Sequence, residues 1–131
     1  MQLKNELYTI VETQVEQSAD TNLPKEARFH LRLHPEHVIY QAHFPGEPIT
    51  PGVCIVQIGK ELLEEVVGSP LEVIKVKNVK FLSVISPKET VSVTYVFKKI
   101  ETSEDCKEVK AQISVMAGEE AKAKVSFICK R

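Results

Sequence analysis

Alternation of apolar and polar residues with period two is the feature that most constrains the fold of this chain. It recurs in five segments, which are residues 7–15, 27–33, 91–97, 109–115 and 121–129. Such alternation is typical of β-strands with one buried face. In a sixth strand-like segment, residues 71–81, the apolar residues change faces midway. A bulge near Lys77 and Asn78 would account for this change. Residues 116–120 predict a hairpin turn between the last two strands.

Only residues 53–67 show helical periodicity. Their apolar positions cover a broad face at 100° per residue, and Gln57 and Glu61 belong to the narrower polar stripe. Gly68 and Pro70 predict the end of this helix. One largely apolar helix among six strands predicts an α+β fold, with an antiparallel sheet of about six strands wrapped around one long central helix. The length of 131 residues fits a single domain covering residues 1–131.

The segment that leads into this helix has the composition of a rigid, reactive loop. Residues 43–53 read His-Phe-Pro-Gly-Glu-Pro-Ile-Thr-Pro-Gly-Val. The prolines restrict the backbone, and His43 supplies a group that exchanges protons near neutral pH. The helix that follows offers unpaired N–H groups at its N-terminus, which favour a carbonyl oxygen or an anion. The sequence therefore predicts chemistry at His43, close to the start of the helix.

The same segment resembles the signature of the 3-hydroxyacyl-acyl carrier protein dehydratases, hotdog-fold enzymes of bacterial fatty acid synthesis. Their pattern is His-Phe-Pro-Gly-x-Pro, two residues, and Pro-Gly-Val before a helix, and every fixed position is present here. A weaker resemblance follows in residues 76–87, although the usual Pro-Gly-Asp turn is Pro87-Lys88-Glu89 in this chain. The resemblance covers roughly residues 38–96.

One departure from the family pattern concerns the helix. The family's catalytic glutamate corresponds to Gln57, and the glutamine that usually follows one helical turn later corresponds to Glu61. An amide cannot exchange protons as a carboxyl group does, so Gln57 cannot take over the glutamate's role. The resemblance then implies His43 as the base and Glu61 as the acid, acting through Gln57 or a water. Gln57 would orient the substrate hydroxyl.

The resemblance also implies a substrate and an assembly. The substrate would be a (3R)-hydroxyacyl thioester on acyl carrier protein, with its carbonyl oxygen bound by the N–H groups of Gly52 or Val53. Phe44 would line the acyl site, and Phe81 either lines it or packs in the core. Because family sites combine a loop of one subunit with the helix of the other, a homodimer or a higher oligomer is expected. No metal or organic cofactor is expected, since the thioester itself acidifies the neighbouring carbon.

Composition excludes several other classes of protein. The net charge is −1 and the lysines are scattered among acidic residues, so binding to nucleic acid is not expected. The sequence contains no run of about 18 apolar residues, so no membrane span is expected, and no secretion signal is evident at the N-terminus. Three irregularly spaced cysteines argue against disulfides or a zinc site and favour the cytoplasm. The other three histidines have no matching ligand cluster.

Three alternatives remain at this stage. In the first, the chain is a catalytically silent hotdog subunit that binds acyl carrier protein or acyl chains and partners an active homologue. The presence of Gln57 in place of the family's glutamate favours this alternative. A hotdog thioesterase ranks last, because those enzymes lack the complete His43 loop. Cys54, in the first helical turn, would be a nucleophile only if its thiol pKa were lowered there; packing is the plainer interpretation.

Overall fold

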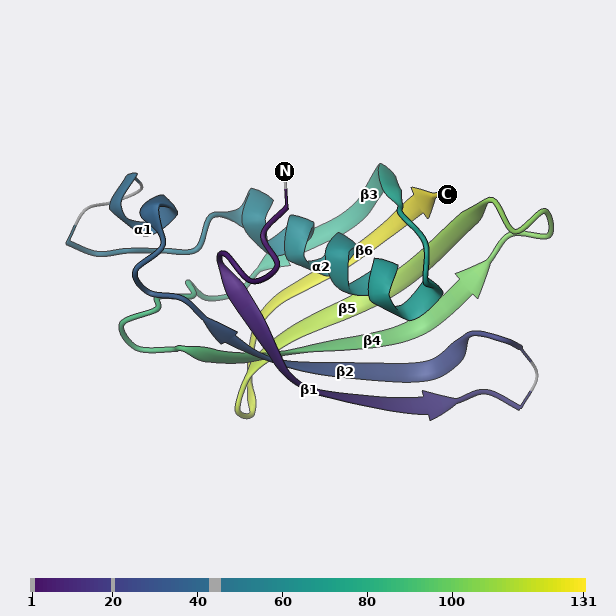
Figure 1. Ribbon diagram of the computed structural model, residues 1–131, viewed down its shortest axis with the longest axis horizontal. Helices are drawn as coiled ribbons and strands as arrows, with labels where there is room; N and C mark the ends of the chain where they lie inside the picture. The colour runs from purple at the N-terminus through teal and green to yellow at the C-terminus, as the bar shows by residue number, and fades with distance from the viewer. Residues whose placement is uncertain (1, 20, 43–45) are drawn as a thin grey trace.

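A single antiparallel sheet forms most of the structure, a computed structural model that describes residues 2–19, 21–42 and 46–131. Within these residues the strands follow the order β1-β2-β4-β5-β6-β3 across the sheet (Figure 1). The strands are β1 (Tyr8–Gln17), β2 (Pro24–Leu33), β3 (Glu72–Phe81), β4 (Ser92–Thr102), β5 (Glu108–Ala117) and β6 (Glu120–Lys130). The helices are α1 (Val38–Ala42) and α2 (Gly52–Val67). The predicted antiparallel sheet and the predicted helix are thus both present.

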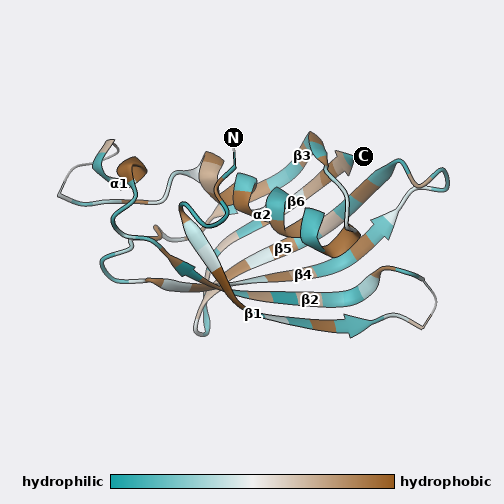
Figure 2. Ribbon diagram, viewed as in Figure 1, coloured by the Kyte–Doolittle hydropathy of each residue, from teal (hydrophilic) through white to brown (hydrophobic). Residues whose placement is uncertain are grey.

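Helix α2 lies across one face of the sheet (Figure 1). Its apolar residues and the strand residues beneath it bury each other, and the hydrophobic stretches of both are visible in Figure 2. The approach is closest at Gly59, where an added Cβ would come within 2.8 Å of Ile113 Cδ1 on β5. The buried hydroxyl of Tyr95 on β4 donates to the carbonyl of Ile55 at 3.0 Å. The helix is therefore fixed on the sheet by both packing and a hydrogen bond.

Several local predictions are confirmed. The register between β3 and β6 shifts between Val76 and Asn78, as expected for the bulge. Strands β5 and β6 join in a tight hairpin, in which Gly118 has a φ of +61°. Helix α2 ends at Gly68, whose φ of +73° is the left-handed conformation that glycine adopts at little cost.

Two expectations are corrected by the structure. The sequence predicted one helix, but residues 38–42 form the five-residue helix α1, so α2 is not the single helix of the chain. In β1, Val11 and Val15 are exposed although their alternation predicted a buried face. The register with β2 shifts between Ile10 and Glu12, which leaves Val11 outside the pairing, and Val15 borders a pocket that separates the edge strand β1 from α2. Among the described residues, neither helix is long and apolar enough to cross a membrane.

Candidate functional site

The N-terminus of α2 places two of the predicted substrate-binding residues at the surface. Pro51 precedes the helix with an extended backbone, and its carbonyl accepts from the N–H groups of Cys54 and Ile55 at 3.0 and 3.1 Å. Gly52 and Val53 stand before these two donors, in the first turn where helix amides lack intrahelical acceptors. Val53 is 68% exposed. Gly52 lies against Phe81, because an added Cβ would come within 2.7 Å of its ring.

Phe81 is not a core residue. It ends strand β3 and is 54% exposed, with its ring against the backbone of Gly52. Core packing, the plainer of the two roles expected from sequence, is therefore wrong for this residue. Its position beside the first turn of α2 agrees with the other expectation, that Phe81 borders the substrate site.

The predicted base His43 and the predicted lining residue Phe44 lie outside the described residues. The described residues on either side of them are held by hydrogen bonds. The hydroxyls of Tyr40 and Thr50 are 2.9 Å apart, and the N–H of Thr50 donates to the carbonyl of Ile85 at 2.8 Å. The Lys88 ammonium donates to the carbonyl of Gly46 at 2.7 Å, where Gly46 has a φ of +94°. These contacts fix where the chain leaves α1 and where it returns toward α2.

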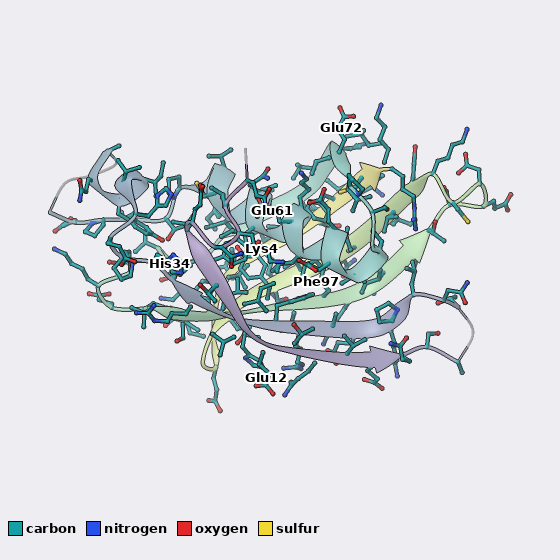
Figure 3. The ribbon with its side chains drawn as sticks, viewed as in Figure 1. Lys4, Glu12, His34, Glu61, Glu72 and Phe97 are labelled. Atoms are coloured by element: carbon teal, nitrogen blue, oxygen red, sulfur yellow. The ribbon has the colours of Figure 1, made fainter. Side chains whose placement is uncertain are left out.

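Glu61 lies in the middle of α2 and is only 6% exposed. Its Oε1 accepts from the backbone N–H of Lys4 and from the Tyr8 hydroxyl, both at 2.9 Å. Its Oε2 accepts from the backbone N–H of Leu3 and from Nε2 of Gln57, both at 2.8 Å. An ionised carboxylate has about four lone-pair sites, so these donors satisfy all of its acceptor capacity. Figure 3 shows Glu61 near Lys4, where the N-terminal segment passes α2.

The N-terminal segment has further support at this point. Leu3 and Leu7 bury their side chains, and Asn5 turns the chain in the left-handed region with a φ of 67°. Lys4 also pairs with the Glu65 carboxylate, one turn beyond Glu61. The buried tyrosine Tyr8 has a raised pKa, first because of burial and then because of its hydrogen bond to Glu61. The turn formed by residues 3–8 is therefore attached to α2 by apolar packing and by two carboxylates, those of Glu61 and Glu65.

Gln57 is half-buried and sits one helical turn closer to the N-terminus of α2 than Glu61. The structure thus brings together Gln57 and Glu61, two of the three predicted catalytic residues. It places Gly52 and Val53 at the first turn of the same helix. Sequence reasoning missed the partners of Glu61, because two of them are backbone amides, which leave no signal in side-chain patterns. The sequence did offer a signal for Lys88, because this residue lies in the turn Pro87-Lys88-Glu89, where the chain departs from the family's Pro-Gly-Asp.

Two other chemistries have little support among the described residues. The thiol of Cys54 is buried, and burial raises its pKa, which opposes the activation that a nucleophile requires. No three His, Cys, Asp or Glu residues of the described chain converge in a way that could hold a metal ion.

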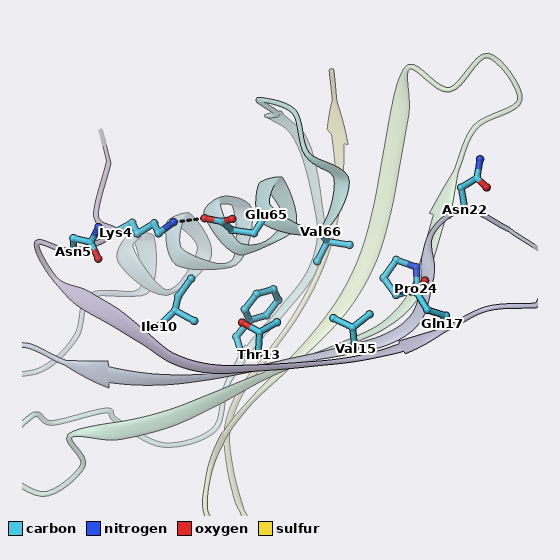
Figure 4. A pocket seen from close by; sticks show the side chains of 11 residues that line it. Lys4, Asn5, Ile10, Thr13, Val15, Gln17, Asn22, Pro24, Glu65 and Val66 are labelled. Atoms are coloured by element: carbon cyan, nitrogen blue, oxygen red, sulfur yellow. Dashed lines mark hydrogen bonds and ion pairs between the residues drawn. The ribbon is translucent and has the colours of Figure 1, made fainter.

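A pocket of about 500 Å³ opens between β1 and the C-terminal half of α2 (Figure 4). Ile10, Thr13 and Val15 of β1 face Val66 across it, and the Lys4–Glu65 ion pair closes one side. None of the predicted site residues that the structure describes lines this pocket. It is therefore separate from the group formed by Gln57, Gly52 and Val53.

The sequence matches a family model described as ApeI-like, ApeI dehydratase, over residues 16–127. This match spans most of the chain and includes the His43 loop and helix α2. No curated protein sequence matches the chain.

Solved structures resemble this one over nearly its whole length. The dehydratase heterocomplex ApeI:P from Xenorhabdus doucetiae gives a TM-score of 0.64 at 17% identity, covering 94% of this chain and 97% of that chain. The (R)-hydratase from A. caviae involved in PHA biosynthesis gives a TM-score of 0.60 at 11% identity, covering 86% of this chain and 98% of that chain. A thioesterase from Pseudomonas aeruginosa gives a TM-score of 0.58 at 13% identity, covering 90% of this chain and 79% of that chain. These likenesses establish the hotdog fold expected from the sequence.

Proposed function

Because the chain belongs to the ApeI-like family of hotdog-fold dehydratases, we propose that it dehydrates a (3R)-hydroxyacyl thioester carried by acyl carrier protein. The product would be the trans-2-enoyl thioester. The observation that carries the proposal is the complete His43 loop within the matched region, directly before α2. A dehydratase without a base at this place would have no group to begin the reaction.

The reaction begins with removal of a proton from the carbon next to the thioester carbonyl. The imidazole of His43 takes this proton, and the thioester carbonyl holds the electron pair until the double bond forms between carbons 2 and 3. The bond between carbon 3 and the hydroxyl oxygen then breaks, and the hydroxyl leaves as water after receiving one proton. Either the imidazolium of His43 returns the proton or a second acid supplies it. The reaction requires no cofactor, because the thioester carbonyl stabilises the electron pair that proton removal leaves on the neighbouring carbon.

The thioester carbonyl gains negative charge during proton removal. We assign its stabilisation to the N–H groups of Gly52 and Val53, in the first turn of α2. Phe44 and Phe81 would border the acyl chain, and the position of Phe81 against Gly52 supports this assignment. Removing one such donor typically costs about 100-fold or more in rate.

Gln57 is assigned to the hydroxyl of the substrate. Its side chain cannot carry a proton, but its amide can hold the hydroxyl in one orientation by a hydrogen bond. The sequence suggested Glu61 as the acid. Its four hydrogen bonds leave no lone pair for a proton unless one donor first withdraws. We therefore favour His43 as both base and acid over Glu61.

We propose that the active form is at least a homodimer that forms along strand β3, in the cytoplasm. β3 ends the sheet, and its side chains Ile74, Val76, Val79 and Phe81 are exposed and apolar. An edge of this kind is suited to pair with another strand. The three cysteines are unpaired, which agrees with a reducing compartment.

A second candidate function is supported by Gln57 together with one relative. The solved structure from Xenorhabdus doucetiae is described as a dehydratase heterocomplex, ApeI:P. By analogy, this chain would pair through β3 with a different hotdog subunit that supplies the missing carboxylate. Alone it would then bind acyl carrier protein without turnover.

Turnover by the purified chain separates these candidates. Hydration of trans-2-enoyl thioesters, on acyl carrier protein and on coenzyme A, is followed by loss of the conjugated absorbance. The proposed function predicts hydration by the chain alone and a loss of at least about 100-fold in His43→Ala. Absence of turnover at every chain length, with activity only after a second hotdog subunit is added, would establish the silent subunit instead.

A further inference from the structure

The contact between Gln57 and Glu61 determines the orientation of the Gln57 amide. Nε2 of Gln57 lies 2.8 Å from Oε2 of Glu61. A carboxylate only accepts hydrogen bonds, so the NH₂ group of the amide must face Glu61. The amide oxygen is bonded to the same carbon as Nε2 and therefore points away from Glu61. A glutamine without such a neighbour could present either group.

Glu61 is itself fixed in place, so it can impose this orientation. The carboxylate is nearly inaccessible, and three further donors hold it from the N-terminal turn. Rotating it would break hydrogen bonds to two backbone amides, and each buried amide left without a partner costs roughly 1–3 kcal/mol. Gln57 thus meets an acceptor whose position is set independently of the substrate.

We propose that Glu61 is a positioning residue for the reaction, and that it acts through Gln57. By holding the NH₂ group, Glu61 presents the Gln57 amide oxygen as the acceptor for the O–H of the 3-hydroxyl group. The hydroxyl oxygen then keeps its lone pairs for the proton that turns it into leaving water. This inference rests on the proposed function for its substrate, but the orientation of the amide does not depend on it.

Two variants, Glu61→Gln and Tyr8→Phe, separate the contacts of the two carboxylate oxygens of Glu61. Glu61→Gln keeps the shape of the side chain but leaves one acceptor oxygen for four donors, which weakens the contact that holds the NH₂ group of Gln57. Tyr8→Phe removes a donor to Oε1 alone and leaves the Oε2 contact with Gln57 in place. We expect Glu61→Gln to lower kcat by about tenfold, the equivalent of one lost hydrogen bond, with little change in KM. Tyr8→Phe should lower Tm but keep kcat within about twofold.

A double-mutant cycle tests whether Glu61 acts through Gln57. In a Gln57→Ala background, Glu61→Gln should lower kcat by less than about twofold further, because the side chain it positions is already gone. The pH profile of kcat should also keep its shape in Glu61→Gln. An equal loss in both backgrounds, or the disappearance of one limb of the profile, would overturn the proposal and indicate an acid role.

A measurement without substrate separates this inference from the proposed function. In NMR spectra, the Gln57 side-chain NH₂ signal is identified by its loss in Gln57→Ala. Its exchange with solvent should be roughly tenfold slower than that of the exposed Gln112, since the group is held by Glu61. The wild-type protein suffices for this test if Glu61→Gln does not fold. A slowed NH₂ group in a protein without turnover supports the positioning and overturns the proposed function. Exchange as fast as in Gln112 overturns the positioning.

Discussion

The hydroxyl groups of Tyr40 and Thr50 lie 2.9 Å apart in the interior, one before and one after the segment that contains His43. Thr50→Val keeps the shape of this side chain but removes the hydrogen bond. We expect a loss of about 1 kcal/mol in the free energy of unfolding. We also expect a larger fractional loss of kcat than in Thr102→Val, which removes an exposed threonine hydroxyl far from the site. Thermal denaturation and thioester hydration check the two effects, and equal kcat in both variants would contradict the role of this pair.

Gly52→Ala is expected to disturb the first turn of α2 through Phe81. The new methyl group would lie 2.7 Å from the ring of Phe81, so the ring must move, and it can do so because it is half-exposed. Hydration activity should fall by about tenfold or more while Tm changes little, since the loss concerns a positioned donor rather than the core. The double variant with Phe81→Ala should recover part of the activity. No recovery would show that the methyl group itself blocks the site.

Gln57→Glu would place a second carboxylate against Oε2 of Glu61, at a contact that now measures 2.8 Å. One of the two carboxyls must then hold a proton, so its pKa in the folded state rises above the ordinary value of about 4.3. The variant should match the wild type in stability below that pH and lose stability as the pH rises toward neutrality. Denaturant unfolding across this range measures the difference. A pH-independent difference would mean that the two side chains do not meet.

The same variant distinguishes the two candidate functions. If the chain alone is a working dehydratase, Gln57→Glu should raise its hydration rate little, because the amide already orients the hydroxyl. If the chain is a silent subunit, the restored carboxylate should raise activity from near zero. The assay uses several acyl lengths, so that an unsuitable chain is not mistaken for inactivity.

All three tyrosines are buried, and burial is the first cause of the raised pKa of Tyr8, Tyr40 and Tyr95. Their folded-state pKa values exceed the unfolded value of about 10, so the stability they contribute is complete below that pH. It is lost as the pH rises, because the unfolded chain releases phenol protons that the folded chain retains. Tyrosinate absorbance should therefore appear together with unfolding rather than before it. A phenol that titrates near pH 10 in the folded protein would contradict this.

The exposed apolar side chains of the two edge strands offer a matched test of the dimer. Val79→Glu on β3 should weaken self-association, because a buried charge at a strand interface is costly. Val11→Glu on β1 adds the same charge at the opposite edge and should leave association unchanged. Sedimentation velocity measures both. A wild-type monomer that retains full activity would exclude an obligate dimer.

The elements with their own periodicity could be predicted from the sequence, including the bulge between Val76 and Asn78. Helix α1 could not, because five residues are too few to show a helical period. Its start depends on local contacts, such as the N–H of Ile39 donating to Nδ1 of His37 at 3.0 Å. The exposure of Val11 could not be predicted either, because the register shift at this residue interrupts the alternation of faces and leaves no signal in the sequence.

The candidate site was predictable only in part. The motif around His43 and the exchanged pair Gln57 and Glu61 are visible in the sequence, and the structure adds that the pair is in contact. The burial of Glu61 was not predictable, because a carboxylate on the polar stripe of a helix normally faces solvent. Here it is compensated by the backbone of Leu3 and Lys4, which only the folded chain brings to it.

The attachment of the N-terminal turn to Glu61 also limits the mutational paths open to this protein. Adopting the order that the resemblance gives as usual, glutamate first and glutamine one turn later, requires both Gln57→Glu and Glu61→Gln. Taken first, the former creates two adjoining carboxylates, and the latter deprives the buried N–H groups of Leu3 and Lys4 of a charged acceptor. Each single step therefore passes through a less stable protein. The changes in the free energy of unfolding of the two single variants should not add up to that of the double variant, because both side chains belong to one hydrogen-bond network.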